Sequence, residues 1–170
     1  MSKLRNMRVI EIPKFRAVSS GEGTLGEIFG NPDGFSAWIA SHRHLLHKPL
    51  YEPVDFLWHE GCDINRSVWI WALREGVTAA EIAPYQILEF PGGLFLAATA
   101  DENDNDDLNE TVAGMRAWIA QSKVFEYGSF PESGMCNMPN PDGEGDKALG
   151  IAQQQIFLPL KPREPQRKDS

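Results

Sequence analysis

Cysteine, basic residues and long apolar runs are all scarce in this chain of 170 residues. The two cysteines, Cys62 and Cys136, are too few for a disulfide framework, and they lack the spacing of metal ligands. We therefore expect free thiols, no structural metal and no cofactor.

No segment approaches the roughly 18 consecutive apolar residues that a membrane-spanning helix needs. Residues 1–5 lead directly into a strand-like segment and do not resemble an apolar signal sequence. The chain has 16 Lys and Arg against 24 Asp and Glu, and its net charge of -8 opposes unspecific attraction to phosphate backbones. We expect a cytoplasmic protein that neither spans a membrane nor binds nucleic acid directly.

The chain matches itself at a displacement of about 80 residues. Three pairs of segments match in the same order: residues 9–13 with 87–91, residues 15–17 with 95–97, and residues 37–41 with 117–121. Three ordered matches predict a duplication, with one copy over about residues 7–78 and the other over about 84–162.

Each copy has the pattern of a strand, a helix and two further strands, which predicts an α+β fold. In the first copy these are an extended segment at 8–18 with a bulge or edge position at Pro13, an amphipathic helix at 34–46, and strands at 54–60 and 67–74. In the second they are a bent strand pair at 85–100 with a break at 91–93, a helix with Leu108, Val112, Met115 and Ile119 as its buried stripe, and strands at 129–138 and 151–160. The acidic run at 101–107 predicts a solvated, helix-capping loop, and residues 163–170 predict a disordered tail.

This pattern resembles the GyrI-like superfamily, which includes gyrase-inhibitor-like proteins and the effector-binding domains of multidrug-responsive and AraC-type transcription regulators. The resemblance rests on the two copies, the Gly-Gly segment at 92–98, the Ala-Trp-Ile helix at 117–119 and the closing strand at 156–160. It covers about residues 7–162, so we expect one domain over residues 1–162.

The resemblance implies an antiparallel sheet with two main helices and a ligand cleft where the two halves meet. Many relatives bind cationic, lipophilic drugs through a carboxylate among aromatic rings, and many carry the domain behind a DNA-binding segment that this chain lacks. This chain therefore resembles a free-standing form. It departs from many relatives at Gln155, where they have a glutamate, so a negative charge must come from elsewhere, and the segment at 130–135 is the next place to look.

Three tryptophans, Trp58, Trp69 and Trp71, lie close together on two predicted strands. Indole faces attract cations by roughly 0.5 to 2 kcal/mol, so these rings are candidates to line a ligand pocket. The alternative is that they pack in the core, and for Trp69 the two interpretations are evenly balanced. Pocket lining is favoured for Trp58 and Trp71.

Glu132 is the first candidate for a ligand-binding carboxylate, because it lies in an apolar stretch where an unpaired charge would be costly. The alternative is an exposed loop position, and Glu126 is the rival acid. The predicted ligand-binding residues are Trp58, Trp69, Trp71, Glu126, Tyr127, Phe130, Glu132, Met135, Gln155 and Phe157.

The sequence favours a module that binds cationic or aromatic small molecules, because it has many aromatic residues and no catalytic signature. One alternative is a hydrolase of electrophilic genotoxins that uses Glu132 or Glu126 to activate water. Another is a regulator of gyrase-inhibitor type that binds a protein. The protein partner would then be a separate regulatory protein or a second copy of this chain.

Overall fold

The computed structural model describes residues 4–48, 54–139, 148 and 150–164. The strands of the first half are β1 (Arg5–Ile12), β2 (Phe15–Ser19), β3 (Asp55–His59) and β4 (Ser67–Ala72). Those of the second half are β5 (Gln86–Phe90), β6 (Gly93–Asp101), β7 (Phe125–Tyr127), β8 (Met135–Asn137) and β9 (Gln153–Pro162). The two main helices are α1 (Phe35–Ser41) and α2 (Asn105–Gln121), and short helical turns lie at Gly26–Gly30, Arg43–Leu45 and Glu60–Cys62. The predicted α+β class is therefore confirmed.

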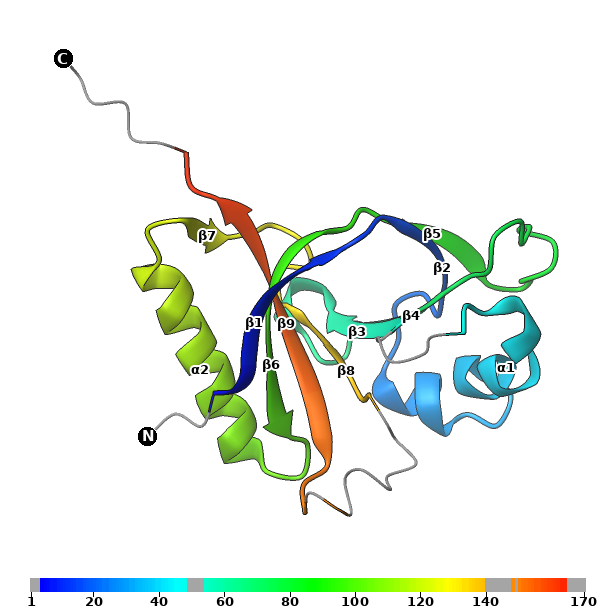
Figure 1. Cartoon of the computed structure of the whole chain (residues 1–170). Helices are drawn as coiled ribbons and strands as arrows, with labels where there is room; N and C mark the ends of the chain where they lie inside the picture. Colours follow the sequence, from blue (N-terminus) through cyan, green and yellow to red (C-terminus); the bar gives the residue numbers. More distant parts are fainter. Residues whose placement is uncertain (1–3, 49–53, 140–147, 149, 165–170) are drawn as a thin grey trace.

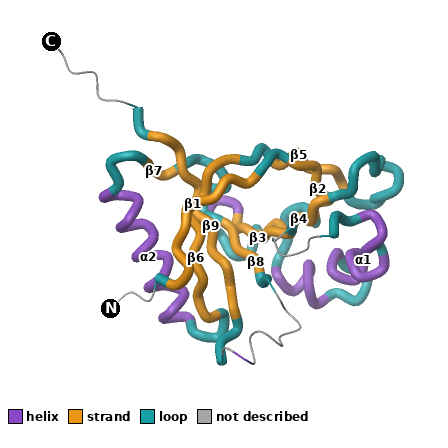
Figure 2. Tube along the Cα trace, in the orientation of Figure 1, coloured by secondary structure: helices purple, strands orange, loops and turns teal. Residues whose placement is uncertain are grey.

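All nine strands belong to one antiparallel sheet with the order β1-β6-β9-β8-β3-β4-β2-β5, and β7 pairs with β9. The two helices lie at opposite ends of this sheet, α2 beside β6 and α1 near β2 and β4 (Figures 1 and 2). The strands β3 and β8 meet in the middle of the order, where Trp58 pairs with Met135.

Alternation along the strands separates two faces of the sheet. Val18 and Ala98 pack in the clusters that contain α1 and α2, whereas their neighbours Ala17 and Ala97 belong to a third cluster without any helical residue. We call the face that carries this third cluster the inner face. Its buried residues, the inner cluster, are Ile12, Ala17, Phe56, Trp58, Val68, Ile70, Phe90, Phe95, Ala97, Met135 and Phe157.

The segment at 8–18, predicted as one extended stretch, is two strands separated by Pro13 and Lys14. The first strand pairs with β6 and the second with β4 and β5. The predicted break at 91–93 is confirmed and separates β5 from β6. Gly92 has φ +71 there, and a Cβ atom on it would lie 2.7 Å from the carbonyl oxygen of Ile12, so the two strand connections touch.

The first helix is shorter than the predicted 34–46 and ends at Ser41, where a separate turn at 43–45 follows. The second begins after Asp104, whose side chain accepts hydrogen bonds from the backbone N–H groups of Asp106 and Asp107. The acidic run is not wholly solvated, because Asp107 is buried and Arg5 Nη1 donates to its carboxylate at 2.7 Å. In the predicted stripe of α2, Met115 and Ile119 are fully buried.

The strand predicted at 129–138 is wrong in extent, because only Met135–Asn137 joins the sheet. Residues 128–134 form a loop instead, and the short β7 precedes it. The closing strand runs to Pro162, and Arg163 still donates from its backbone N–H to Val124 at 2.8 Å. The predicted disordered tail lies mostly outside the described residues, since 165–170 are not described.

In the part of the chain that the structure describes, neither helix is long and apolar enough to cross a membrane.

Candidate functional site

Trp58 lies at the junction of the two halves of the sheet, on the inner face. It is 2% exposed, and its strand neighbour across the junction is Met135, which in turn pairs with Phe157. Both partners are also buried in the inner cluster. Three of the sequence-predicted site residues are therefore in one place.

Phe130 joins this group from the loop between β7 and β8. Its ring stands edge-on to Trp58 with centroids 5.6 Å apart, and it lies 6.0 Å from the ring of Phe90. The side chain is 38% exposed, so one surface of this aromatic group is open to solvent. Trp58 Nε1 donates to a carboxylate oxygen of the half-exposed Glu60 at 2.6 Å. An exposed ring therefore lies close to an indole that is bonded to a negative charge. We call Trp58, Phe130 and Glu60 the aromatic rim.

A row of polar side chains runs across the inner face beside the aromatic residues. Asn137 pairs directly with Gln155, and Gln155 pairs with Thr99 on its other side. Directly opposed residues point to the same face of a sheet, and this row is two residues along the strands from the row Met135, Phe157 and Ala97. We call Thr99, Gln155 and Asn137 the polar row.

Two acceptors of the polar row receive no hydrogen bond from the described residues. Asn137 is 4% exposed and donates through Nδ2 to the backbone oxygen and the carboxylate of Asp55, at 2.9 and 2.7 Å. Its Oδ1 atom and Gln155 Oε1 are buried, and no group among the described residues donates a hydrogen bond to either of them. Two buried acceptors without a donor are costly, which marks this end of the inner face as unusual.

Asp55 connects the polar row to the other face of the sheet, because it also accepts a hydrogen bond from Trp69 Nε1 at 3.0 Å. Burial raises the pKa of its carboxyl group from 3.8 to about 6, although the hydrogen bonds from Trp69 and Asn137 act to lower it. The group is ionised at pH 7, and no ion pair of Asp55 with Lys or Arg exists in the described part of the chain.

Trp69 and Trp71 do not join Trp58, because alternation along β4 places them on the helix-covered face. Trp69 contacts Phe29, Phe35 and Trp71, at centroid distances of 4.7, 5.6 and 5.8 Å. Both tryptophans are half-buried against the cluster of α1. The sequence pattern correctly placed them on one face together, but Trp71 does not face Trp58.

The remaining predicted residues do not belong to the inner cluster, and one of them, Tyr127, packs against the cluster of α2. Glu126 is paired with Lys161 at 2.9 Å and with Arg163 at 3.5 Å, and the hydrogen bond from Lys161 lowers its pKa. Glu132 is exposed, and its backbone oxygen accepts a hydrogen bond from Tyr127 Oη at 3.0 Å. Burial raises the pKa of Tyr127, whose ring also lies 4.9 Å from the guanidinium of Arg116.

The sequence interpretation missed Glu60, Asp55, Asn137 and Thr99. Period-2 alternation beyond Trp58 was a signal for Glu60, because the second residue after an inward-facing one lies on the same side. The same rule, applied from Met135, would have found Asn137. Asp55 and Thr99 had no comparable signal, because their roles depend on strands that are far apart in the sequence.

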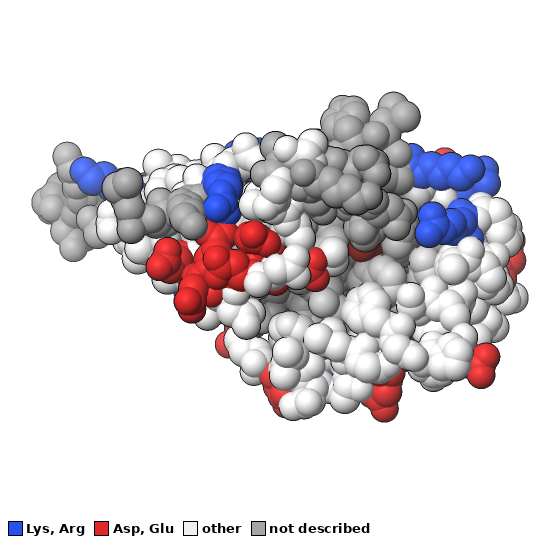
Figure 3. Space-filling model, turned by 90° about the horizontal axis from the view of Figure 1, so that it is seen from below, with Lys and Arg blue, Asp and Glu red and all other residues white. Residues whose placement is uncertain are grey.

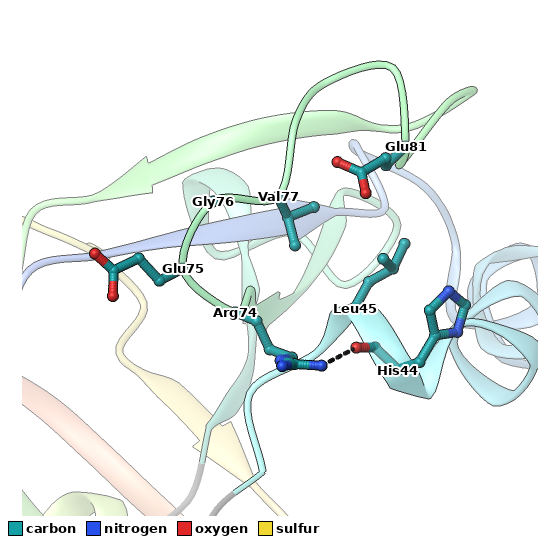
Figure 4. A pocket seen from close by; sticks show the side chains of 7 residues that line it. All are labelled: His44, Leu45, Arg74, Glu75, Gly76, Val77 and Glu81. Atoms are coloured by element: carbon teal, nitrogen blue, oxygen red, sulfur yellow. Dashed lines mark hydrogen bonds between the residues drawn. The ribbon is translucent and has the colours of Figure 1, made fainter.

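Two other features are separate from this site. An open hollow of about 320 Å³ lies near α1, lined by His44, Leu45, Arg74, Glu75, Gly76, Val77 and Glu81 (Figure 4). Arg74 Nη1 donates there to the backbone oxygen of His44 at 3.0 Å, and no sequence-predicted site residue lines it. Among the described residues, no group of three or more His, Cys, Asp or Glu could hold a metal ion.

Cys136, between Met135 and Asn137 on β8, is a weak candidate for a nucleophile. Burial raises the pKa of its thiol to about 11, so the thiolate is rare near neutral pH.

Acidic side chains gather on the outer surface of the molecule. Figure 3 shows a continuous group of them on the face seen from below.

Comparison with solved structures supports the fold. The chain is similar to a hydrolase from Listeria innocua, with a TM-score of 0.58, 12% identity and 93% coverage of each chain. It is also similar to SAV2435 bound to tetraphenylphosphonium, with a TM-score of 0.50, 12% identity, and coverage of 92% of this chain and 94% of that one. These matches support the fold that the sequence resemblance implies. No protein-family model matches the chain, and no curated protein matches it significantly by sequence.

Proposed function

We propose that this protein binds cationic small molecules with aromatic or lipophilic groups, and that they bind at the aromatic rim of the inner face. The observation that carries this proposal is the exposed ring of Phe130 standing on Trp58, whose indole N–H is bonded to the carboxylate of Glu60. An aromatic surface beside a carboxylate attracts a cation through the ring quadrupole and the negative charge together.

The position of the rim supports the same proposal. Under the sequence repeat, β1, β2, β3 and β4 correspond to β5, β6, β8 and β9, and the strand order then reads the same from either end. The first strand of each half pairs with the other half, as β1 does with β6 and β5 with β2. This symmetry supports a duplication whose halves meet between β3 and β8, where Trp58 and Met135 lie. A ligand site at such a junction would draw residues from both copies.

The structural neighbour SAV2435 binds tetraphenylphosphonium, a cation surrounded by aromatic rings. That finding belongs to the neighbour, but it agrees in ligand chemistry with the rim described here. The net charge of -8 also favours the approach of cations at low ionic strength.

Hydrolysis is the second candidate, because another neighbour of similar fold is a hydrolase. Its proposed bases are poorly suited to the task. The ion pair with Lys161 stabilises the charged form of Glu126 and makes it a weaker base, and Glu132 lies exposed in a loop. We therefore rank binding above hydrolysis.

Calorimetric titration with tetraphenylphosphonium tests the proposal. We expect binding by the wild-type protein and an affinity about tenfold lower in Phe130→Ala, because the exposed aromatic surface is lost. Phe29→Ala is the matched control, since Phe29 is also exposed beside a tryptophan but on the other face. Absence of heat with tetraphenylphosphonium and with other aromatic cations, or equal losses in both variants, would contradict the proposed site.

A further inference from the structure

The inner face offers hydrogen-bond acceptors that its own donors do not satisfy. Asn137 Oδ1 and Gln155 Oε1 are closed to solvent, and no described residue donates to them. The two side chains belong to directly paired positions of β8 and β9, so they lie next to each other on one face. A single donor group placed between them would therefore bond to both.

A carboxylate lies beside these acceptors, and no Lys or Arg of the described residues pairs with it. Asn137 Nδ2 binds the carboxylate of Asp55 at 2.7 Å, which links the two amide oxygens to a charged group. Burial raises the pKa of that carboxyl group to about 6, so it is charged at neutral pH but incompletely stabilised. A positively charged donor would satisfy the oxygens and compensate the carboxylate at once.

We propose that Asn137, Gln155 and Asp55 form a subsite for the protonated N–H group of a ligand, such as a primary ammonium or an amidinium. This inference rests on the proposed function, because it assigns the charged end of a ligand whose aromatic end lies at the rim. The preferred ligand is thus an aromatic amine or amidine rather than a fully substituted onium ion.

The spacing along β8 sets a lower limit on the length of that ligand. Met135, which pairs with Trp58 of the rim, and Asn137 are two residues apart on the same face, a separation of roughly 7 Å. An aromatic ring joined to an ammonium group by one or a few carbon atoms spans this distance. Inorganic anions and acidic ligands are rejected, because every group of the subsite that lacks a partner is an acceptor or a carboxylate.

The test compares two probes with the same ring and the same charge: 2-naphthylmethylammonium and its N,N,N-trimethyl derivative. Only the first has N–H donors. We expect the wild-type protein to bind the primary ammonium at least about tenfold more tightly, the ratio that one hydrogen bond with a single charged partner supplies. Calorimetry at pH 7.5 with both probes, and with tetraphenylphosphonium in parallel, measures this ratio.

Variants show whether the preference for the primary ammonium comes from its N–H donors or from its smaller size. Gln155→Met and Asn137→Leu each remove one of the two acceptors. In each variant the ratio of the affinities for the two naphthyl probes should fall to within about threefold. Gln155→Met is the safer variant, because Asn137→Leu also breaks the bonds to Asp55. Gln86→Met, an exposed glutamine on β5, is the matched control and should keep the wild-type ratio.

The outcomes distinguish this inference from the proposed function. Equal binding of the two naphthyl probes, or a ratio unchanged in Gln155→Met, overturns the N–H subsite but leaves cation binding at the rim intact. Failure of all three cations to bind overturns the proposed function and this inference with it.

Discussion

The two faces of the sheet each carry a tryptophan, a carboxylate and an exposed phenylalanine, but the residues around them differ. Each has a tryptophan whose indole N–H donates to a carboxylate and whose ring contacts an exposed phenylalanine. On the inner face these residues are Trp58, Glu60 and Phe130, and on the helix-covered face they are Trp69, Asp55 and Phe29.

The surroundings of the two groups decide what each can do. On the helix-covered face Trp69 also contacts Phe35 and Trp71, so its ring is part of the packing of α1 against the sheet. On the inner face Trp58 is buried where β3 meets β8, and the ring of Phe130 is exposed to solvent. The same residue types therefore help to pack a helix against the sheet in one place and lie where β3 meets β8 in the other.

The largest expected effect is the loss of folding stability when a buried ring of the inner face is removed. Phe157 is 0% exposed and stands edge-on to Phe56 at 5.5 Å in the inner cluster. Phe157→Ala should lower the free energy of unfolding by about 3 to 5 kcal/mol, because it leaves a cavity in a packed core. Urea denaturation measures the change. A loss below about 1 kcal/mol would show that the inner cluster is not close-packed.

The carboxylate that links the two faces should make stability depend on pH. The pKa of Asp55 is raised to about 6 from 3.8, so the folded state holds this proton more tightly than the unfolded state. The stabilisation from this proton is complete below about pH 4 and is lost as the pH rises through about 6. Asp55→Asn keeps an uncharged group and should therefore exceed the wild type in stability above about pH 7, by up to about 3 kcal/mol.

Urea denaturation of Asp55→Asn and the wild type between about pH 4 and pH 8 checks this sign. The difference should shrink toward zero at the acidic end. Glu126→Gln is the control with the opposite trend, because Lys161 lowers the pKa of Glu126 and its stabilisation is lost on acidification. A difference between Asp55→Asn and the wild type that does not change with pH would contradict an unusually high pKa of Asp55.

The smallest expected effect concerns the two exposed rings. Phe130 is 38% and Phe29 is 45% exposed, so replacing either with alanine should cost about 1 kcal/mol or less of stability. Thermal unfolding of the two variants side by side measures this. A much larger loss in Phe130→Ala than in Phe29→Ala would mean that the Phe130 ring supports the loop at 128–134 rather than offering a binding surface.

Local sequence patterns were sufficient for most of the fold. Alternation, helical spacing and the break at 91–93 located most strands and both helices, since these signals depend on neighbouring residues. They failed at 129–138, where Met135–Asn137 alone finds a place between β3 and β9. Whether an extended segment joins a sheet depends on distant strands, which local patterns do not contain.

The candidate site was predictable only in part for the same reason. Trp58, Phe130, Met135 and Phe157 were predicted together and lie together, because each stands in an apolar segment near the expected junction. Trp71 was grouped with Trp58, although the register of β3 against β4 places the two indoles on opposite faces. Of the polar row, Gln155 was predicted, but Asn137 and Thr99 escaped prediction because the row is assembled from three strands, β6, β8 and β9.

The five tryptophans provide one direct test of where the ligand binds, because they report on different regions. Trp58 lies on the inner face, Trp38, Trp69 and Trp71 lie in the cluster of α1, and Trp118 lies on α2. Protein labelled with 5-fluorotryptophan should give a separate ¹⁹F NMR signal for each, assigned by single Trp→Phe variants. Addition of tetraphenylphosphonium should shift the Trp58 signal most. A shift confined to Trp69 and Trp71, with Trp58 unchanged, would place the ligand on the helix-covered face and contradict a site at the aromatic rim.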